Sequence, residues 1–144
     1  MQIEVLPNVS MTTPLKTIPT KDADGEDNGI VVPIWHVDSG RRVDQVYLTT
    51  ILPGKQKGPH LHFVRAGAFT VLVGRVLIVT RENGQYNEHV CGIGFKTIHV
   101  SPGVPCCMYN IGSESAMVLN CPDKPWRDNS DEFVPEDWTY EVRA

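Results

Sequence analysis

The stretch PGKQKGPHLHFVRAG, residues 53–67, decides the fold of this 144-residue chain. It holds two of the chain's five histidines, His60 and His62, directly before an apolar segment. Side chains alternate along a β-strand, so the two histidines point to one face and Leu61 to the other. Two imidazoles on one face suit metal ligation or proton transfer near neutral pH, and ordinary structural histidines also fit.

Short strand-like runs surround this stretch. Runs rich in Val, Ile, Leu and Thr predict strands at residues 30–36, 45–52, 60–64, 68–73, 75–81, 88–92, 95–100, 106–111 and 116–120. The residues between them are of the types that turns favour. No window of a dozen residues carries a helical apolar stripe free of Gly or Pro. The sequence therefore predicts an all-β fold, a small antiparallel β-barrel or jelly roll.

The length predicts a single domain over residues 1–144. We expect the barrel at about residues 30–121, while the first ~28 residues show little periodicity. Residues 122–144 are expected to form an ordered tail that wraps the body. Trp126, Phe133 and Trp138 would supply its buried area.

The overall composition excludes several classes of function. A net charge of −4 gives no basic surface for nucleic acid. No apolar run reaches the ~20 residues of a membrane helix, and the N-terminus lacks the pattern of a signal peptide. The four cysteines form no CxxC pair, which argues against a structural zinc knuckle and favours reduced thiols. We expect a cytoplasmic protein.

Glycines on both sides of the histidine pair extend it into a longer pattern. Gly54 lies six residues before His60, and Gly74 lies twelve after His62. The later stretch SPGVPCCMYN contains a Pro-Gly turn and ends at Asn110. Over residues 50–112 this pattern resembles the two signature motifs of the cupin superfamily. The resemblance implies a small β-barrel with both histidines inside.

The ligand positions of metal-binding cupins are only half occupied. Besides the two histidines, those proteins use a glutamate and a later histidine. By the resemblance, the glutamate position falls on Gly67, or on Ala66, and the later histidine position falls on Cys106. A site for zinc or iron built from His60, His62 and Cys106 is the alternative that remains. The preferred interpretation needs no metal and no cofactor.

The segment KGPHLH, residues 57–62, also resembles the active-site strand of two metal-free cupin families. These are the dTDP-4-dehydrorhamnose 3,5-epimerases and the dTDP-4-keto-6-deoxyhexose 3,4-ketoisomerases. The resemblance implies that His60 is the base and His62 the second histidine of the ketoisomerases. Lys57, at the position of an arginine, and Arg65 would hold the substrate's diphosphate, and Cys106 would contact the substrate.

The acid and the orienting aspartate of the epimerases have no clear counterpart. Their acid is a tyrosine, and the corresponding stretch MVLNCPD, residues 117–123, contains none. Tyr109 is the candidate acid, on the condition that its side chain points inward. Asp123 and Asp131 are candidates for the aspartate that orients the histidine.

The expected function is that of a metal-independent isomerase of carbohydrate biosynthesis. It would epimerise or ketoisomerise a 4-keto-6-deoxy nucleotide sugar by histidine acid–base chemistry next to the keto group. The alternatives are a metal-dependent dioxygenase or isomerase and a cupin that binds a sugar without turning it over. By analogy with small cupins, we expect a homodimer, in which N-terminal strands can be exchanged.

Overall fold

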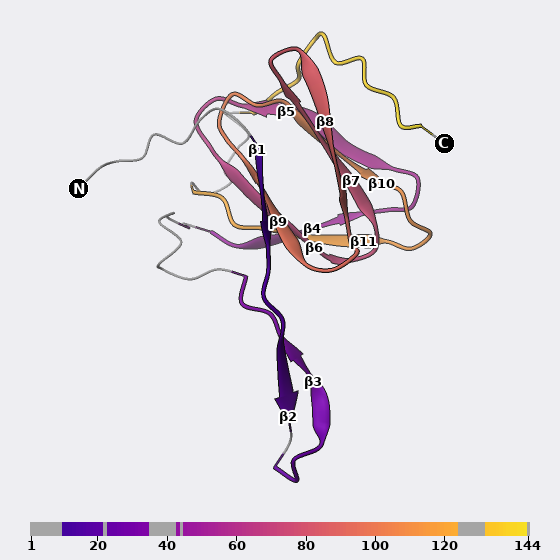
Figure 1. Ribbon diagram of the computed structural model, residues 1–144. Helices are drawn as coiled ribbons and strands as arrows, with labels where there is room; N and C mark the ends of the chain where they lie inside the picture. Colours follow the sequence, from indigo (N-terminus) through magenta and orange to yellow (C-terminus); the bar gives the residue numbers. More distant parts are fainter. Residues whose placement is uncertain (1–9, 22, 35–42, 44, 124–131, 144) are drawn as a thin grey trace, which may run out of the picture.

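The computed structural model describes residues 10–21, 23–34, 43, 45–123 and 132–143 of the chain. These residues form twelve β-strands and no helix (Figure 1), which confirms the all-β prediction. Ten strands build two five-stranded sheets, and the other two form a separate hairpin. No helix within the described ranges is long and apolar enough to cross a membrane.

The two sheets pack face to face, with every strand antiparallel to its neighbours (Figure 1). The first has the order β1 (Ser10–Pro14), β9 (Lys96–Val100), β6 (Gly67–Val73), β11 (Ala116–Asn120) and β4 (Tyr47–Ile51). The second has the order β12 (Glu132–Phe133), β5 (Gln56–His62), β10 (Cys106–Asn110), β7 (Val76–Glu82) and β8 (Gln85–Cys91). Consecutive strands often lie in different sheets, as in a jelly roll.

Strand β7 explains how the core is built. Its sequence VLIVTRE is buried at each of the first five residues, because the strand is covered on both faces. Val76 and Ile78 point between the sheets, where they join a cluster that includes Ile98. Leu77 and Val79 point outward into a second cluster. The continuous apolar run is therefore the mark of a strand with two buried faces.

The C-terminal segment covers the outer face of the second sheet. Trp138 and Tyr140 pack on the outer cluster, and Trp138 Nε1 donates a hydrogen bond to Tyr109 Oη at 3.0 Å. Trp138, one of the residues expected to supply the tail's buried area, packs here on the body of the protein. Phe133 stays 48% exposed and contacts the ring of Phe63. Trp126 lies outside the described residues.

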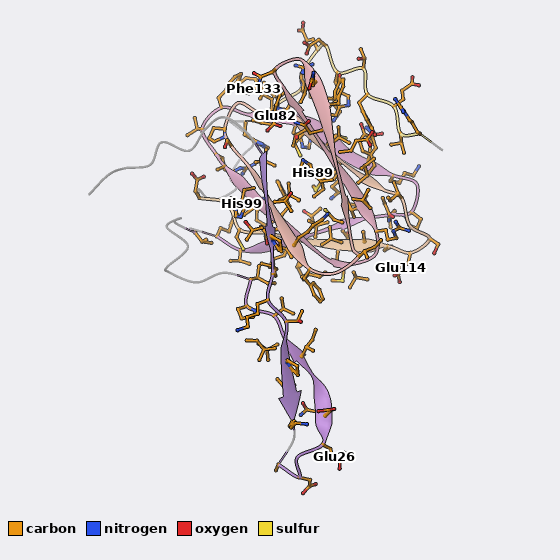
Figure 2. All side chains as sticks on the ribbon, viewed as in Figure 1. Glu26, Glu82, His89, His99, Glu114 and Phe133 are labelled. Carbon is orange, nitrogen blue, oxygen red and sulfur yellow. The ribbon has the colours of Figure 1, made fainter. Side chains whose placement is uncertain are left out.

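A hairpin of β2 (Ile18–Lys21) and β3 (Asp27–Val31) extends away from the barrel (Figure 1). Glu26 lies near its far end (Figure 2). The strand predicted at 30–36 is wrong in its position, because β3 ends at Val31 and residues 32–34 are not in a strand. Residues 35 and 36 lie outside the described residues. All five residues of β3 are exposed, so no alternation of apolar and polar side chains marks this strand.

The eight strands predicted between residues 45 and 120 are confirmed as β4 to β11. The largest shift concerns β5, which begins at Gln56 rather than at residue 60. Gly58 and Pro59 lie near the start of β5. Because turns favour these residue types, the sequence pattern does not predict a strand there.

Candidate active site

A cavity of about 440 Å³ lies between the two sheets, beside the apolar core. Strands β4, β5, β6, β10 and β11 all contribute to its wall. Its polar lining consists of Gln45, Tyr47, Thr49, Lys57, His60, His62, Arg65, Ser101 and Asn120. Five of the six residues predicted for the site line this cavity: Lys57, His60, His62, Arg65 and Cys106.

Strand β5 brings a lysine and two histidines to one face because its pairing with β10 shifts by one residue. His60 lies opposite Cys106, and Lys57 lies opposite Met108. Two residues of β5 therefore oppose one residue of β10, which is a β-bulge. Strict alternation would place Lys57 and His60 on opposite faces of the sheet. The bulge adds one residue and turns Lys57 toward the histidines.

Gly58 is the residue that permits this bulge. Its φ of 100° lies in a region that residues with a Cβ rarely adopt. A Cβ at this position would also lie 2.9 Å from the carbonyl oxygen of Cys106 on the neighbouring strand. Because both the conformation and the close approach exclude a side chain, the glycine fixes the register of Lys57 relative to His60.

His60 and His62 lie edge to face in the cavity, and His62 is held from two sides. The ring centroids of the two histidines are 6.2 Å apart, with 64° between the ring planes. Arg65 Nη2 lies 2.8 Å from His62 Nε2, within hydrogen-bond distance. The backbone nitrogen of Gly103 donates to the carbonyl oxygen of His62 at 2.6 Å.

Asp123 contacts the backbone that carries Arg65. The nitrogen of Ala66 donates to Asp123 Oδ1 at 2.8 Å, and the nitrogen of Asp123 donates back to the carbonyl oxygen of Ala66 at 3.3 Å. These bonds tie the segment after β5 to the segment after β11. Asp131, the other predicted candidate, lies outside the described residues.

Tyr47 and Asn120 line the cavity, although the sequence pattern singles out neither. They are paired across β4 and β11, and Asn120 Nδ2 donates to Tyr47 Oη at 2.7 Å. Asn120 Oδ1 accepts from the nitrogen of Ala68 at 3.0 Å, which fixes the amide. Since the phenol accepts a bond here, its own hydrogen can be donated elsewhere. Side chains alternate along residues 45–49, so Gln45, Tyr47 and Thr49 share one face. This alternation is the sequence signal that could have identified Tyr47.

Tyr109 does not line the cavity, and its expected role as the acid is corrected. The side chain belongs to the outer cluster, where the hydroxyl accepts a hydrogen bond from Trp138. Burial raises the pKa of Tyr109 above its ordinary value. The physical reason is the period of two: Cys106 and Met108 face inward, so Tyr109 faces outward.

The described part of the chain does not offer a ligand set that fits a metal ion. Among the described residues, no group of three His, Cys, Asp or Glu side chains is arranged to hold one. A Cβ at Gly67 would lie 2.5 Å from the ring of Phe69, so the ring occupies space that a side chain at this expected glutamate position would need. Burial raises the pKa of the Cys106 thiol, which disfavours the ligating thiolate. The alternative site of His60, His62 and Cys106 is therefore not supported.

Solved structures with this fold include several enzymes of dTDP-sugar chemistry. A dTDP sugar isomerase from Desulfovibrio desulfuricans G20 is 24% identical, with a TM-score of 0.76 over 89% of this chain and 85% of that chain. A sugar 3,4-ketoisomerase from Thermoanaerobacterium thermosaccharolyticum, solved in complex with TDP, is 19% identical, with a TM-score of 0.73 over 92% of both chains. An epimerase from Mycobacterium tuberculosis is 17% identical, with a TM-score of 0.72 over 92% of this chain and 70% of that chain.

These likenesses confirm the all-β jelly-roll fold that the sequence predicts. At 24% identity and below, they establish the fold and not the activity. No protein-family model matches the chain, and no curated protein matches it significantly.

Proposed function

We propose that the chain is a metal-independent isomerase that moves a proton next to the keto group of a 4-keto-6-deoxy nucleotide sugar. One observation carries the proposal: two imidazoles, a lysine and a tyrosine hydroxyl meet in a single cavity. A barrel without chemistry would fill these inward positions with apolar side chains, because burying polar groups is costly. The fold shared with dTDP-sugar isomerases and epimerases supports the same substrate class.

His60 is the proposed base. The carbons next to a C4 carbonyl carry acidic hydrogens, and an imidazole can remove one of them near neutral pH. The electrons of that C–H bond form a carbon–carbon double bond to C4, and the carbonyl electrons move to O4. If His60 delivers the proton to C4 and the C3 hydroxyl hydrogen replaces the one given to O4, the keto group moves to C3 and C4 carries the hydroxyl. If a second acid protonates the same carbon from the opposite face and O4 gives its proton back, the C4 keto group is restored and the sugar is epimerised.

Tyr47 is the proposed acid in place of Tyr109. It lies on β4 of the first sheet, whereas His60 lies on β5 of the second, so the two groups approach a bound sugar from opposing walls. The hydrogen bond from Asn120 fixes the phenol oxygen, which leaves its hydrogen to be given to O4. General acid catalysis of this kind contributes roughly 10²- to 10⁴-fold to a rate.

Lys57 is the proposed diphosphate contact. It is exposed and lines the same cavity as the histidines, so its ammonium group can meet an anion at the cavity mouth. A lysine binds phosphate as a point charge rather than through a planar fork. Arg65, the second cation predicted for this role, already contacts His62.

Exchange with heavy water tests the proton transfer directly. The protein is incubated in D₂O with the 4-keto-6-deoxy sugars of dTDP, UDP, GDP and CDP, and deuterium uptake at the carbons flanking the keto group is followed by NMR. We expect uptake with at least one nucleotide, and loss by roughly 10²-fold or more in His60→Asn. The product spectrum then separates an epimer from a 3-keto isomer.

The matched control is His89→Asn. His89 lies on β8 (Figure 2) and is not among the residues that line the cavity, so exchange should stay within about twofold of the unsubstituted protein. Absence of exchange with all four sugars, or full exchange in His60→Asn, would overturn the proposal. Thermal stabilisation by a nucleotide without any exchange would identify a sugar-binding protein that is not an enzyme.

We also propose that the chain works as a homodimer. The hairpin of β2 and β3 extends from the barrel with Ile30 52% and Val31 51% exposed. An isolated two-stranded hairpin is marginally stable in water, so a second copy that covers it would stabilise it. Light scattering should give twice the chain mass, and Ile30→Asp should shift it toward the monomer. A monomeric mass at all protein concentrations would contradict this.

The cytoplasm is the compartment that we propose for this activity. The four cysteines, Cys91, Cys106, Cys107 and Cys121, are all free thiols. Free thiols are typical of reducing compartments. Localisation of a tagged chain by fractionation tests this assignment.

A further inference from the structure

The hydrogen bond between Arg65 and His62 determines which nitrogen of the histidine carries a hydrogen. The two groups meet at 2.8 Å, from Arg65 Nη2 to His62 Nε2. A guanidinium has five N–H donors and no acceptor, so Arg65 must donate in this pair. His62 Nε2 must therefore present a lone pair. In a neutral imidazole the ring hydrogen then lies on Nδ1.

A histidine in this form cannot take a proton at Nε2 while the pair is intact. Protonation at Nε2 would put two donors face to face and two positive charges side by side. The other imidazole of the cavity, His60, is not part of this hydrogen bond. The two histidines of the HxH motif thus differ in their chemistry, although they share one strand face.

The position of Arg65 is itself fixed by contacts on both sides of the segment. Asp123 accepts from and donates to the backbone of Ala66, the next residue. On the other side, the carbonyl oxygen of His62 accepts from Gly103 at 2.6 Å. Both ends of the segment between His62 and Ala66 are therefore held by neighbouring chain segments, and the arginine is aimed at the ring.

We propose that Arg65 is a positioning residue that holds His62 in the neutral form with the hydrogen on Nδ1. His62 then serves the site as a fixed hydrogen-bonding group, and His60 alone accepts the substrate proton. Asp123 supports this arrangement through its bonds to the backbone of Ala66. This inference rests on the proposed function for its catalytic part, but the state of the ring can be measured without substrate.

The first test reads the ring directly. The full chain is labelled with ¹⁵N, and two-bond ¹H–¹⁵N correlations of the imidazoles are recorded between about pH 6 and pH 8, where histidines ordinarily titrate. His62 is assigned from the signals that disappear in His62→Gln. We expect the hydrogen on Nδ1 throughout in the unsubstituted protein, a mixture of forms in Arg65→Met, and retention in Arg65→Lys, which still donates. The proposal would be overturned if the ring hydrogen of His62 lies on Nε2 in the unsubstituted protein. It would also be overturned if the hydrogen stays on Nδ1 alone in Arg65→Met.

The second test uses catalysis. Arg65→Met should lower kcat about tenfold or more with KM changed less than threefold, and Arg65→Lys should recover most of kcat. In Arg65→Met, the decrease in kcat on the acid side of the pH profile should also begin at a higher pH than in the unsubstituted protein. The reason is that His62 can be protonated once the guanidinium is gone. The charged and titratable groups that share the cavity, Tyr47, Lys57, His60 and Cys106, are unchanged in this comparison. A raised KM with unchanged kcat would make Arg65 a diphosphate ligand and overturn the proposal.

Asp123 provides the matched pair of variants. Asp123→Asn keeps an acceptor oxygen for the nitrogen of Ala66, whereas Asp123→Ala removes it. We expect His62 to lose its single form in the alanine variant and to keep it in the asparagine variant, with melting curves recorded to establish that both fold. If no nucleotide sugar reacts at all, the proposed function fails, and the ring measurement still decides the positioning role.

Discussion

The two faces of strand β10 have opposite surroundings. Cys106 and Met108 line the cavity, whereas Cys107 and Tyr109 lie under the aromatic side chains of the C-terminal segment. Residues that are neighbours in sequence thus face different environments. One is a cavity that a small molecule can enter, and the other is filled by packed side chains. The parity of a position on this strand, rather than its distance from the histidines along the chain, decides what a substitution does there.

The outer face is built to stabilise. Its rings interlock, with the centroids of Tyr86 and Trp138 5.0 Å apart and those of Tyr109 and Tyr140 5.7 Å apart. Burial raises the pKa of Tyr140 to about 12, so this hydroxyl stays neutral and donates to Glu88 at 2.6 Å. The inner face instead keeps polar groups around an open volume that tighter packing would close. The outer face therefore contributes to stability, and the inner face carries the groups proposed for catalysis.

The two tyrosines give the largest expected difference between the faces. Tyr47→Phe should lower kcat by roughly 10²-fold, because the proposed acid loses its hydrogen. Tyr109→Phe removes the same hydroxyl from the outer face and should leave kcat within about twofold. Steady-state kinetics on both variants measures the contrast. Equal losses would show that the division between the faces is wrong.

Trp138→Ala should affect stability and not chemistry. The substitution removes a large ring from the outer cluster and the donor of the bond to Tyr109, at a cost of about 2 kcal/mol in the free energy of unfolding. Urea unfolding measures that cost. Because no atom of the cavity wall changes, kcat per folded molecule should be unaffected. A fall in kcat at temperatures well below the melting point would contradict this.

Gly58→Ala should affect both faces at once. The added Cβ would strain a φ of 100° and press on the Cys106 carbonyl, for a cost of about 1–2 kcal/mol. Because the bulge orients Lys57, the Kd for TDP should rise several-fold, as it should in Lys57→Gln. Calorimetric titration with TDP measures the affinity. The control is Gly84→Ala, at a turn where a Cβ would meet nothing within 4 Å.

The smallest effect is expected at the rim of the outer face, where Arg81 and Asp137 pair at 2.8 Å. The hydrogen bond from Arg81 lowers the pKa of Asp137 below its ordinary value of 3.8. A carboxyl whose pKa is lower in the folded state stabilises the fold above its unfolded pKa and loses that contribution as the pH falls through the folded value. The small difference in Tm between the unsubstituted protein and Asp137→Asn should therefore be present near pH 7 and disappear in acid, once the carboxyl is protonated in the folded state as well. A difference that persists in acid would contradict this sign.

The strands of the barrel could be predicted because each has at least one buried face. Residues 76–79 and 116–120 show this directly, since burial selects apolar residues at fixed positions. The hairpin of β2 and β3 has no such face, and its exposed sequence carries no periodic signal. The strand predicted at 30–36 was misplaced for the same reason.

The site could be predicted only where its residues lie close together in sequence. The HxH pair and the lysine before it stand within six residues, 57–62. Tyr47 depends on the pairing of β4 with β11, which joins it to Asn120 across 73 positions, and no local pattern carries that information. Tyr109 could have been rejected from the sequence, because an inward Cys106 requires an outward residue three positions later. The contact of Arg65 with His62 depends on a turn whose shape only the structure gives.

The ring of Phe69 beside Gly67 has a consequence for any attempt to build a metal site in this cavity. A Gly67→Glu substitution would supply a carboxylate, but its Cβ would lie 2.5 Å from that ring. The ring must therefore rotate away or be replaced by a smaller side chain before the carboxylate fits. A design that seeks a metal site here has to treat Gly67 and Phe69 as one unit.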